Sequence, residues 1–446
     1  MFTKLFSWVS KTLSLLCFGI IASMLATTAQ AGVKIQQWKT AQGAQVLFVE
    51  NHDLPILDIS TGFHAGSARD ADNKTGVAGL TRFMMTLGAG GLSDEQIAKK
   101  MADIGATLGG GVNADQSSFT LRTLSNQRER SLALDIYRKI LQQPDFPAAV
   151  LSREKARVIA GIQESMTQPE SISNKAFYAG LYGNHPYGKD EDGDLESVKS
   201  IQANDLKQFY QQYYGAKSAV IAMIGDISRS EAEQIADSLA AGLPQAEAPA
   251  ALPKVSYPTA PIEKRIPHPA TQAHILLGYP GIKRGDEDYF PLYVGNYILG
   301  GGGFVSRLTE EVREKRGLVY SVYSYFMPLA ELGPFQVGLQ TKKEQANEAL
   351  TLVRATLQAF IDNGPNEAEL KAAKQNITGG FPLRLDSNSK ILEYLALIGF
   401  YQLPLSYLDD FNQRVNQVTT AQIKQAFQRR IQPANMVTVV VGAESA

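Results

Sequence analysis

The sequence has 446 residues, of which 44% are apolar and 20% are charged, and its formal net charge is −1. This length is too great for one ordinary hydrophobic core, so we expect two domains or a duplicated one, and the composition excludes a disordered chain. A net charge near zero supplies no positive field for nucleic acid or an anionic membrane surface, so neither is expected as a partner.

The N-terminal segment, residues 1–31, has the pattern of a secretory signal peptide. Lys4 and Lys11 precede an apolar run over residues 13–25, and a small-x-small cleavage site ends at Ala31. A transmembrane anchor is the alternative, but the run is short for a membrane span. We therefore expect cleavage of residues 1–31, export to the periplasm and no membrane attachment afterwards.

The only cysteine, Cys17, lies inside this apolar run. Cleavage of the signal peptide would remove it and leave a mature chain without a thiol. That excludes cysteine catalysis, cysteine-ligated zinc and disulfides from the expected chemistry.

Short β-branched or alternating apolar runs predict strands, and longer amphipathic runs predict helices. Each half of the chain combines predicted strands with paired helices, which favours an α+β (α/β layered) fold. In chain order, the predicted strands are residues 46–50, 57–63, 117–123, 219–224, 274–278, 318–325, 335–340 and 436–441, and the predicted helices are residues 94–104, 127–141, 347–361 and 367–378.

The chain also repeats itself at a constant offset, which relates residues 198–225 to residues 415–442. Both segments read as a short entry, a helix and a β-rich run that ends in glycine. Asn204 and Thr420 are the expected caps of the two helices. The repeat predicts two homologous halves.

The boundaries of these halves follow from the repeat and from composition. Residues 32–242 are expected to form the N-terminal half and residues 262–446 the C-terminal half. The Pro- and Ala-rich residues 243–261 between them lack the periodicity of a helix or strand and are predicted to be a linker.

Residues 299–321 are the most informative stretch of the second half. A glycine run at residues 300–303 precedes a helix that Ser306 could cap, and Arg313 and Tyr320 follow, seven positions apart. A guanidinium and a phenol can both donate to a peptide carbonyl or a C-terminal carboxylate. The alternative is that Arg313 pairs with a neighbouring glutamate on the helix surface and Tyr320 fills the core.

This stretch resembles the C-terminal half of the M16 (pitrilysin-type) zinc peptidases, and the resemblance covers nearly the whole mature chain. It implies two LuxS-like metallohydrolase-type halves that form a clamshell, with Arg313 and Tyr320 holding the substrate backbone. Gly111 and Asn113 lie in a segment that resembles the family's edge strand, to which an extended substrate adds by backbone hydrogen bonds. An ordinary glycine turn before a strand is the alternative for that segment.

The zinc motif of that family, H-x-x-E-H, is degenerate here. After the Gly-x-Ala entry at Gly76, Gly79 and Phe83 stand at the two histidine positions and Arg82 stands at the position of the glutamate base. Farther along, Ala160 and Gly161 occupy the place of the family's acidic pair. We therefore expect this chain to have no metal ligands, no catalytic residues and no cofactor of its own.

The resemblance implies a non-zinc M16 subunit that orients an unfolded peptide for a zinc-bearing M16 partner, which supplies the catalytic water. The first alternative is a catalytically inert peptide-binding or structural homologue. An autonomous peptidase with a relocated metal is the weakest hypothesis, because no two of the five histidines (His52, His64, His185, His268 and His274) stand three or four positions apart.

Overall fold

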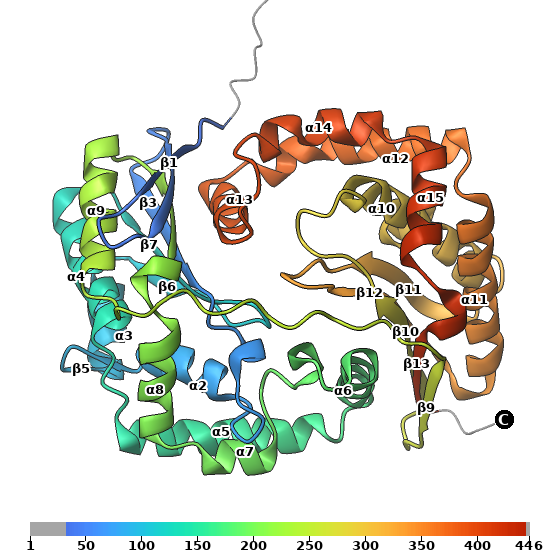
Figure 1. The fold of residues 1–446 in the computed structure, drawn as a ribbon, viewed down its shortest axis with the longest axis horizontal. Coiled ribbons are helices and arrows are strands. Elements are labelled where there is room, and N and C mark those ends of the chain that lie inside the picture. Colours follow the sequence, from blue (N-terminus) through green and yellow to red (C-terminus); the bar gives the residue numbers. More distant parts are fainter. Residues whose placement is uncertain (1–32, 443–446) are drawn as a thin grey trace, which may run out of the picture. The chain divides into compact units, whose positions relative to one another are not determined.

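Two β-sheets with the same strand order organise the chain in the computed structural model, which describes residues 33–442 (Figure 1). The predicted signal peptide, residues 1–31, lies outside the described residues. From Ile35 onward the chain forms one compact unit. The first sheet runs β1 (Gln36–Lys39), β2 (Gln45–Glu50), β8 (Val220–Gly225), β3 (Ile56–Phe63), β7 (Ser117–Leu124) and β6 (Thr107–Gly109), and the second runs β9 (Ile262–Ile266), β13 (Val437–Val441), β10 (Gln272–Pro280), β12 (Pro334–Lys342) and β11 (Val319–Phe326).

The five strands of the second sheet correspond one by one to β2, β8, β3, β7 and β6 of the first, and β1 has no counterpart among the described residues. β2 and β8 are parallel, as are β9 and β13, whereas β3–β7 and β10–β12 are antiparallel. The constant offset seen in the sequence relates the first residues of β2 and β9, of β8 and β13, and of β7 and β12. The predicted duplication into two homologous α+β halves is therefore confirmed by topology.

Helices flank both sheets. The first half contributes α2 (Val77–Met85), α3 (Asp94–Asp103), α4 (Gln127–Gln142), α5 (Ala148–Ser165), α6 (Pro169–Tyr182), α7 (Leu195–Ser200), α8 (Ala203–Tyr213) and α9 (Arg229–Ala241). The second contributes α10 (Tyr289–Asn296), α11 (Ala346–Asn363), α12 (Glu367–Gly380), α13 (Asn388–Phe400), α14 (Tyr407–Gln417) and α15 (Thr420–Arg430), with π-helices η4 (Tyr297–Gly301) and η6 (Thr309–Glu314). None of these helices within residues 33–442 has the length and apolar content needed to cross a bilayer.

All the strands and helices predicted from the sequence are present, with ends within two residues of the prediction. The predicted helix caps were wrong. Gln202 and Thr419, not Asn204 and Thr420, are the N-caps of α8 and α15, because each of these helices begins earlier than the pattern indicated. Ser306 stands at the start of a helical segment, where its carbonyl accepts the Glu310 N–H, but its hydroxyl donates to the Gly303 carbonyl instead of capping a backbone N–H, and the segment soon winds as a π-helix.

Each half lends one helix to the other half's sheet (Figure 1). α6 packs on β10 and β13, where Phe177 lies so close to Gly278 that a Cβ there would come within 2.4 Å of its ring. α13 packs on β2, β3 and β8, where a Cβ on Gly399 would come within 2.5 Å of Val220. Each sheet is therefore covered in part by a helix from the other half, and the two helices occupy equivalent places in the repeat.

A buried carboxylate joins the halves. It belongs to the loop between β6 and β7 and bonds the loop between β11 and β12. Asp115, only 5% exposed, accepts hydrogen bonds from the hydroxyls of Tyr187 (2.5 Å) and Tyr401 (2.9 Å) and from the backbone N–H of Ala330 (2.7 Å). The Tyr187 hydroxyl also accepts the N–H of Glu331 at 3.1 Å. Three donors from both halves thus converge on one side chain.

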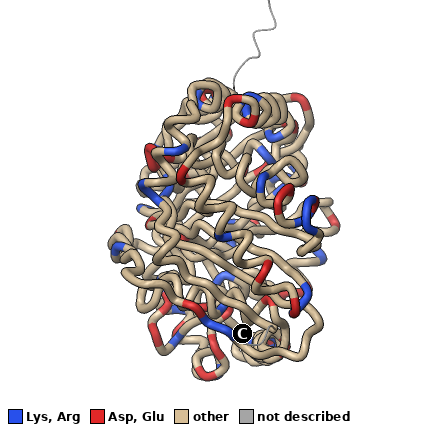
Figure 2. The backbone as a smooth tube through the Cα atoms, turned by 90° about the vertical axis from the view of Figure 1, so that its right-hand side faces the viewer, with Lys and Arg blue, Asp and Glu red and all other residues tan. Residues whose placement is uncertain are grey.

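Residues 244–261 pass between the halves without forming a helix or strand. The Arg69 guanidinium donates to the Ala250 carbonyl at 2.8 Å, and the His185 ring bonds the Pro253 carbonyl at 2.8 Å, so the segment is fixed to the first half. Figure 2 shows Lys and Arg interspersed with Asp and Glu along the backbone, as expected for a net charge of −1.

Candidate functional site

The helix that aligns with the zinc motif is α2, and a buried aspartate holds its N-terminus. Gly76, in the left-handed region at φ 89°, precedes the helix. The Asp70 carboxylate accepts the N–H groups of Gly76 (2.6 Å) and Ala78 (3.0 Å). Burial raises the pKa of Asp70 to about 7, although these backbone hydrogen bonds and Lys189 act in the opposite direction.

The two histidine positions of the motif carry side chains that cannot bind a metal. A Cβ on Gly79 would have only the Glu191 carbonyl nearby, at 3.8 Å, and Phe83 is a 36% exposed hydrocarbon ring. Neither offers a nitrogen or oxygen donor from its side chain, so the residues of α2 do not fit zinc.

Arg82, at the position of the glutamate base, turns toward the edge of the first sheet. Its Nη2 donates to the Gly109 carbonyl (2.5 Å), its Nε donates to the Ser118 carbonyl (3.2 Å), and its guanidinium lies 5.1 Å from the centre of the Phe119 ring. Burial lowers its pKa. Among residues 33–442, no carboxylate lies within ion-pair distance of Arg82. The partners of this cation are backbone carbonyls and an aromatic face.

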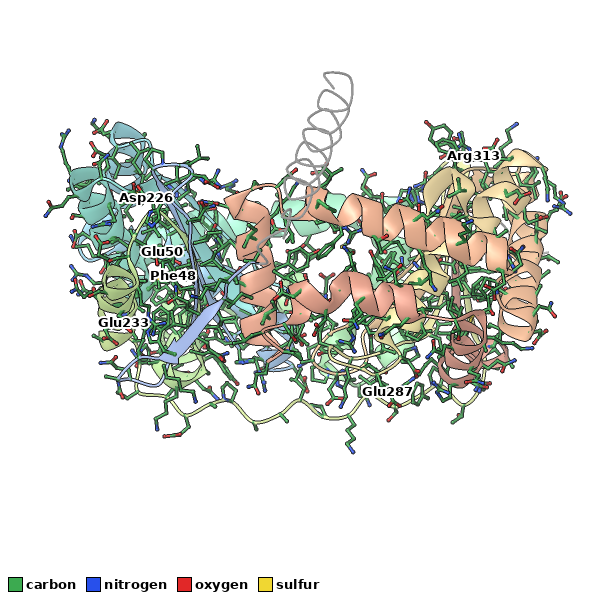
Figure 3. All side chains as sticks on the ribbon, turned by 90° about the horizontal axis from the view of Figure 1, so that it is seen from above. Phe48, Glu50, Asp226, Glu233, Glu287 and Arg313 are labelled. Carbon is green, nitrogen blue, oxygen red and sulfur yellow. The ribbon has the colours of Figure 1, made fainter. Side chains whose placement is uncertain are left out.

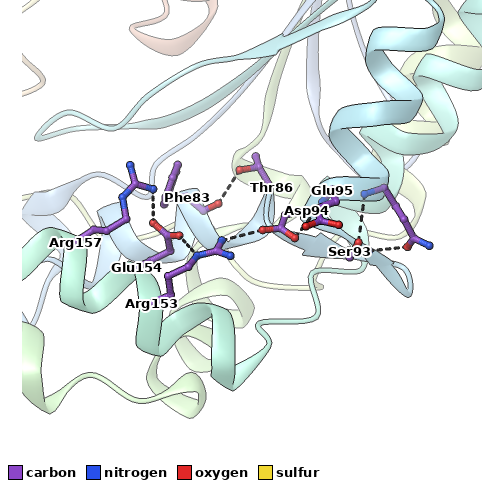
Figure 4. Close-up of polar contacts among 9 residues, drawn as sticks. Phe83, Thr86, Ser93, Asp94, Glu95, Arg153, Glu154 and Arg157 are labelled. Atoms are coloured by element: carbon purple, nitrogen blue, oxygen red, sulfur yellow. Dashed lines mark hydrogen bonds and ion pairs between the residues drawn. The ribbon is translucent and has the colours of Figure 1, made fainter.

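The second expected source of a zinc ligand, α5, is also occupied differently. Glu154, on this helix, is 2% exposed and lies between Arg153 (2.7 Å) and Arg157 (2.9 Å). Arg153 continues the row to Asp94 at 2.8 Å, and Figure 4 shows Phe83 beside these residues. Arginines therefore neutralise the one buried carboxylate on this helix.

No other described part of the chain replaces the missing ligands. Over residues 33–442, no group of three or more His, Cys, Asp or Glu side chains is arranged to hold a metal ion. Gly161, at the family's acidic position, has nothing within 4 Å of where a Cβ would stand. The donor set thus does not fit the zinc of the M16 peptidases.

The predicted substrate edge consists of the segment between β6 and β7. The Gly111 N–H donates to the Ser118 hydroxyl (3.2 Å), and its carbonyl accepts the Ser118 N–H (2.8 Å). The Asn113 side chain accepts the N–H groups of Asp115 and Gln116, both at 2.9 Å, so it shapes the turn. The structure places both residues beside the edge strand β6, and their role in binding substrate stays a prediction.

Arg313 and Tyr320 lie together on the surface of the second half. Tyr320 is 79% exposed, so the alternative in which it fills the core is wrong. The Arg313 guanidinium lies 5.8 Å from the centre of the Tyr320 ring and 4.8 Å from that of Phe304. Its shortest ion contact among the described residues is 3.7 Å, to Glu314, which leaves its N–H donors available.

Phe304 is a member of this group that the sequence reasoning missed. It is 72% exposed on η5 (Gly303–Val305), immediately after the glycine run, and a bulky aromatic there had no predicted partner. By contrast, Arg316 pairs with Glu311 at 3.0 Å and is a surface charge. In Figure 3 Arg313 lies at the opposite end of this unit from Glu50 and Asp226 of the first sheet.

Comparisons with known proteins agree with these features. A family model described as "Peptidase M16 inactive domain" matches residues 200–377, and one described as "Insulinase (Peptidase family M16)" matches residues 46–191. The solved structure of a peptidase M16 inactive domain from Pseudomonas fluorescens is 39% identical, with a TM-score of 0.89, and the match covers 93% of this chain and 99% of that one.

Two curated relatives are more distant. The "Non-peptidase homolog YmxG" of Helicobacter pylori is 27% identical over 85% of this chain and 87% of its own length. The "Uncharacterized zinc protease YmxG" of Bacillus subtilis is 26% identical over 80% of this chain and 86% of its own length. The chain belongs to the M16 peptidase family, as a member of its inactive type.

Proposed function

We propose that this chain is the non-zinc subunit of a two-chain M16 metalloendopeptidase in the periplasm. It binds an unfolded peptide and presents it to a zinc-bearing M16 partner, which carries out the hydrolysis. Periplasmic location is proposed from the signal-peptide pattern of residues 1–31.

The observation that carries this proposal is the difference between two sites. The zinc-motif positions Gly79 and Phe83 have no metal-binding side-chain donors, whereas Arg313 lies beside two exposed aromatic rings. Among the described residues its ion contact is with Glu314 at 3.7 Å, too long for a hydrogen bond. A guanidinium ordered in this way loses little side-chain entropy when it binds a peptide carbonyl or carboxylate. The chain thus has a means of holding peptide without a means of cutting it.

Within such a complex, Arg313 and Tyr320 orient the peptide by donating to its backbone. Zinc and the general base would come from the partner's motif, since Arg82 cannot accept a proton from water at the pH of the periplasm. Any proteolysis should therefore appear only when the two chains are mixed.

The test begins with the tagged mature chain purified from periplasm, followed by assays with whatever M16 chain co-purifies. In the reconstituted complex, Arg313→Ala should lower peptide turnover by about 100-fold, because misplacement of a bound substrate costs that much, while the zinc content stays unchanged. Arg316→Ala is the matched control, because Arg316 lies close by on the same segment and already pairs with Glu311. It should leave turnover unchanged.

Two results would count against the proposal. Unchanged turnover for Arg313→Ala in an intact complex would remove the role in holding substrate. Purification of the chain alone, with no zinc and no M16 partner, would favour the alternative of an inert peptide-binding or structural homologue, in line with the name of its Helicobacter pylori relative.

A further inference from the structure

The position that M16 peptidases use for their catalytic base is occupied here by a cation that touches only the edge of the first sheet. β6 is the last strand of this sheet, and the described residues place no strand on its outer side. Arg82 reaches it from α2 and bonds one carbonyl on β6, that of Gly109, and one on β7, that of Ser118. The guanidinium therefore spans the two strands.

The ladder between β6 and β7 is interrupted at this point. Regular pairing ends at Gly109 opposite Thr120, and a single bridge resumes at Val112 opposite Ser117. Between them Gly110 adopts φ 104°, and a Cβ there would come within 2.2 Å of the Ser118 carbonyl. Such an irregularity bends an edge strand and re-aims the residues that follow it.

The guanidinium stabilises this bend in a way that no other side chain at position 82 would. Its planar fork reaches carbonyls on both strands at once, and its face packs against Phe119, on the neighbouring strand. A lysine has one ammonium point charge and would satisfy one carbonyl well but not the fork geometry. An alanine would leave the partly buried carbonyls of Gly109 and Ser118 without these donors.

We propose that Arg82 is a positioning residue for peptide binding: it fixes the bent segment 109–113 in the shape that lets an extended peptide add to the edge of β6. Arg82 does not itself touch the peptide. Main-chain hydrogen bonds along an edge strand require that strand to be held extended, so a preformed edge binds more tightly than one that must be ordered first. This inference rests on the proposed function, because it assumes that the chain binds peptide.

The test measures the affinity of the full mature chain for fluorescein-labelled casein peptides, by fluorescence anisotropy, in three variants. Arg82→Ala should weaken binding by about tenfold, and Arg82→Lys by less, because preorganisation is lost in part. Methylguanidinium added to Arg82→Ala should restore affinity. Arg130→Ala is the matched control, because Arg130 is also mostly buried (17% exposed) but pairs with Glu231, on α9.

A second readout separates positioning from general stability. Amide hydrogen exchange of residues 107–118 should accelerate in Arg82→Ala and not in Arg130→Ala, whereas both variants lower the melting temperature. If peptide affinity falls in proportion to melting temperature in both variants, Arg82 is only structural and the inference is wrong.

Failure of the inference and failure of the proposed function give different results. If Arg82→Ala binds peptide as tightly as the wild type while Arg313→Ala loses binding, the inference fails and the proposed function stands. If the wild type does not bind the casein peptides, both fail.

Discussion

Each half of this chain has a buried aspartate on the chain segment that leads from a long strand, β3 or β10, into the next α-helix, and the two aspartates have opposite chemistry. Asp70 meets only backbone N–H groups, and burial raises its pKa to about 7. Burial also raises the pKa of Asp288, before α10, but hydrogen bonds from Arg429 and Arg430 outweigh it and the net pKa is lowered. The two halves thus share a backbone topology but shift the pKa of these aspartates in opposite directions.

The arginines of the two halves differ in the same way. Arg82 is half-buried and donates to carbonyls of its own sheet, whereas Arg313 lies beside exposed rings and, within residues 33–442, makes its ion contact with Glu314 at 3.7 Å. One cation supports a strand and the other is available to a ligand. If both proposals hold, the first half would shape a binding edge through Arg82 and the second would contact the bound peptide through Arg313.

The largest expected loss of stability is at Asp115, which has no acidic counterpart in the second half. At the offset that relates the two halves, Asp115 corresponds to Leu332, so only the first half supplies the buried carboxylate that joins them. Asp115→Ala leaves two tyrosine hydroxyls and a backbone N–H without their acceptor, and should lower the free energy of unfolding by about 3 kcal/mol or more. Urea denaturation of the variant and the wild type measures this loss of unfolding free energy. Asp72→Ala, at a side chain 95% exposed, is the control and should change little.

The exchanged helices should respond alike if the halves are structurally equivalent. Gly399→Ala places a methyl group 2.5 Å from Val220, and Gly278→Ala places one 2.4 Å from Phe177, so each should destabilise the chain by about 1–3 kcal/mol through overpacking. Gly161→Ala, in the open interior of α5, should instead stabilise it by about 0.5–1 kcal/mol. A large loss for only one of the first two would show that one helix alone holds the halves together.

The contrast between Asp70 and Asp288 predicts a pH dependence. Because the folded pKa of Asp70, about 7, lies above its unfolded value of 3.8, the folded state binds more protons between these values. The stabilisation is complete below pH 3.8 and is lost as the pH rises through 7, by at most about 1.4 kcal/mol per pH unit. The free energy of unfolding of Asp70→Asn should therefore fall less between pH 3.8 and 7 than that of the wild type. Equal pH dependence in the two proteins would show that Asp70 is not the group responsible.

The smallest effect concerns the helix caps. Thr419 accepts the Gln422 N–H at 3.2 Å, so Thr419→Ala should cost about 1 kcal/mol of unfolding free energy. Thr420→Ala removes only a surface hydrogen bond to Glu367 and should cost less. Thermal unfolding of the two variants, side by side, distinguishes the cap seen in the structure from the one that the sequence pattern indicated.

Local pattern was enough to predict much of the fold, because strand alternation and helix periodicity are local properties. The repeat predicted the shared topology, and the resemblance to the M16 family, not spacing alone, predicted that Arg313 and Tyr320 act together; the guanidinium lies 5.8 Å from the centre of the phenol ring. The exchange of α6 and α13 was not predictable: both helices are only weakly amphipathic, which suggests contacts on more than one side, but nothing in them identifies which sheet they cover.

The candidate site was predictable in its residues but not in its contacts. The sequence identified Arg82 as a cation in a degenerate motif, yet its partners are backbone carbonyls, which carry no sequence signal. Phe304 was missed for a related reason: an exposed aromatic after a glycine run resembles a core residue until the chain is folded. The π-helices around it likewise have no periodic signature.

The exchange of α6 and α13 means that the first sheet can be complete before the helix that covers it is in place. The first sheet gains its last long strand, β8, at Gly225, but the helix that covers it ends only at Phe400. Until residues 388–400 fold onto it, the apolar face of this sheet has no cover. A fragment that stops after the linker would keep that face exposed permanently, so neither half should be obtainable as a soluble domain on its own.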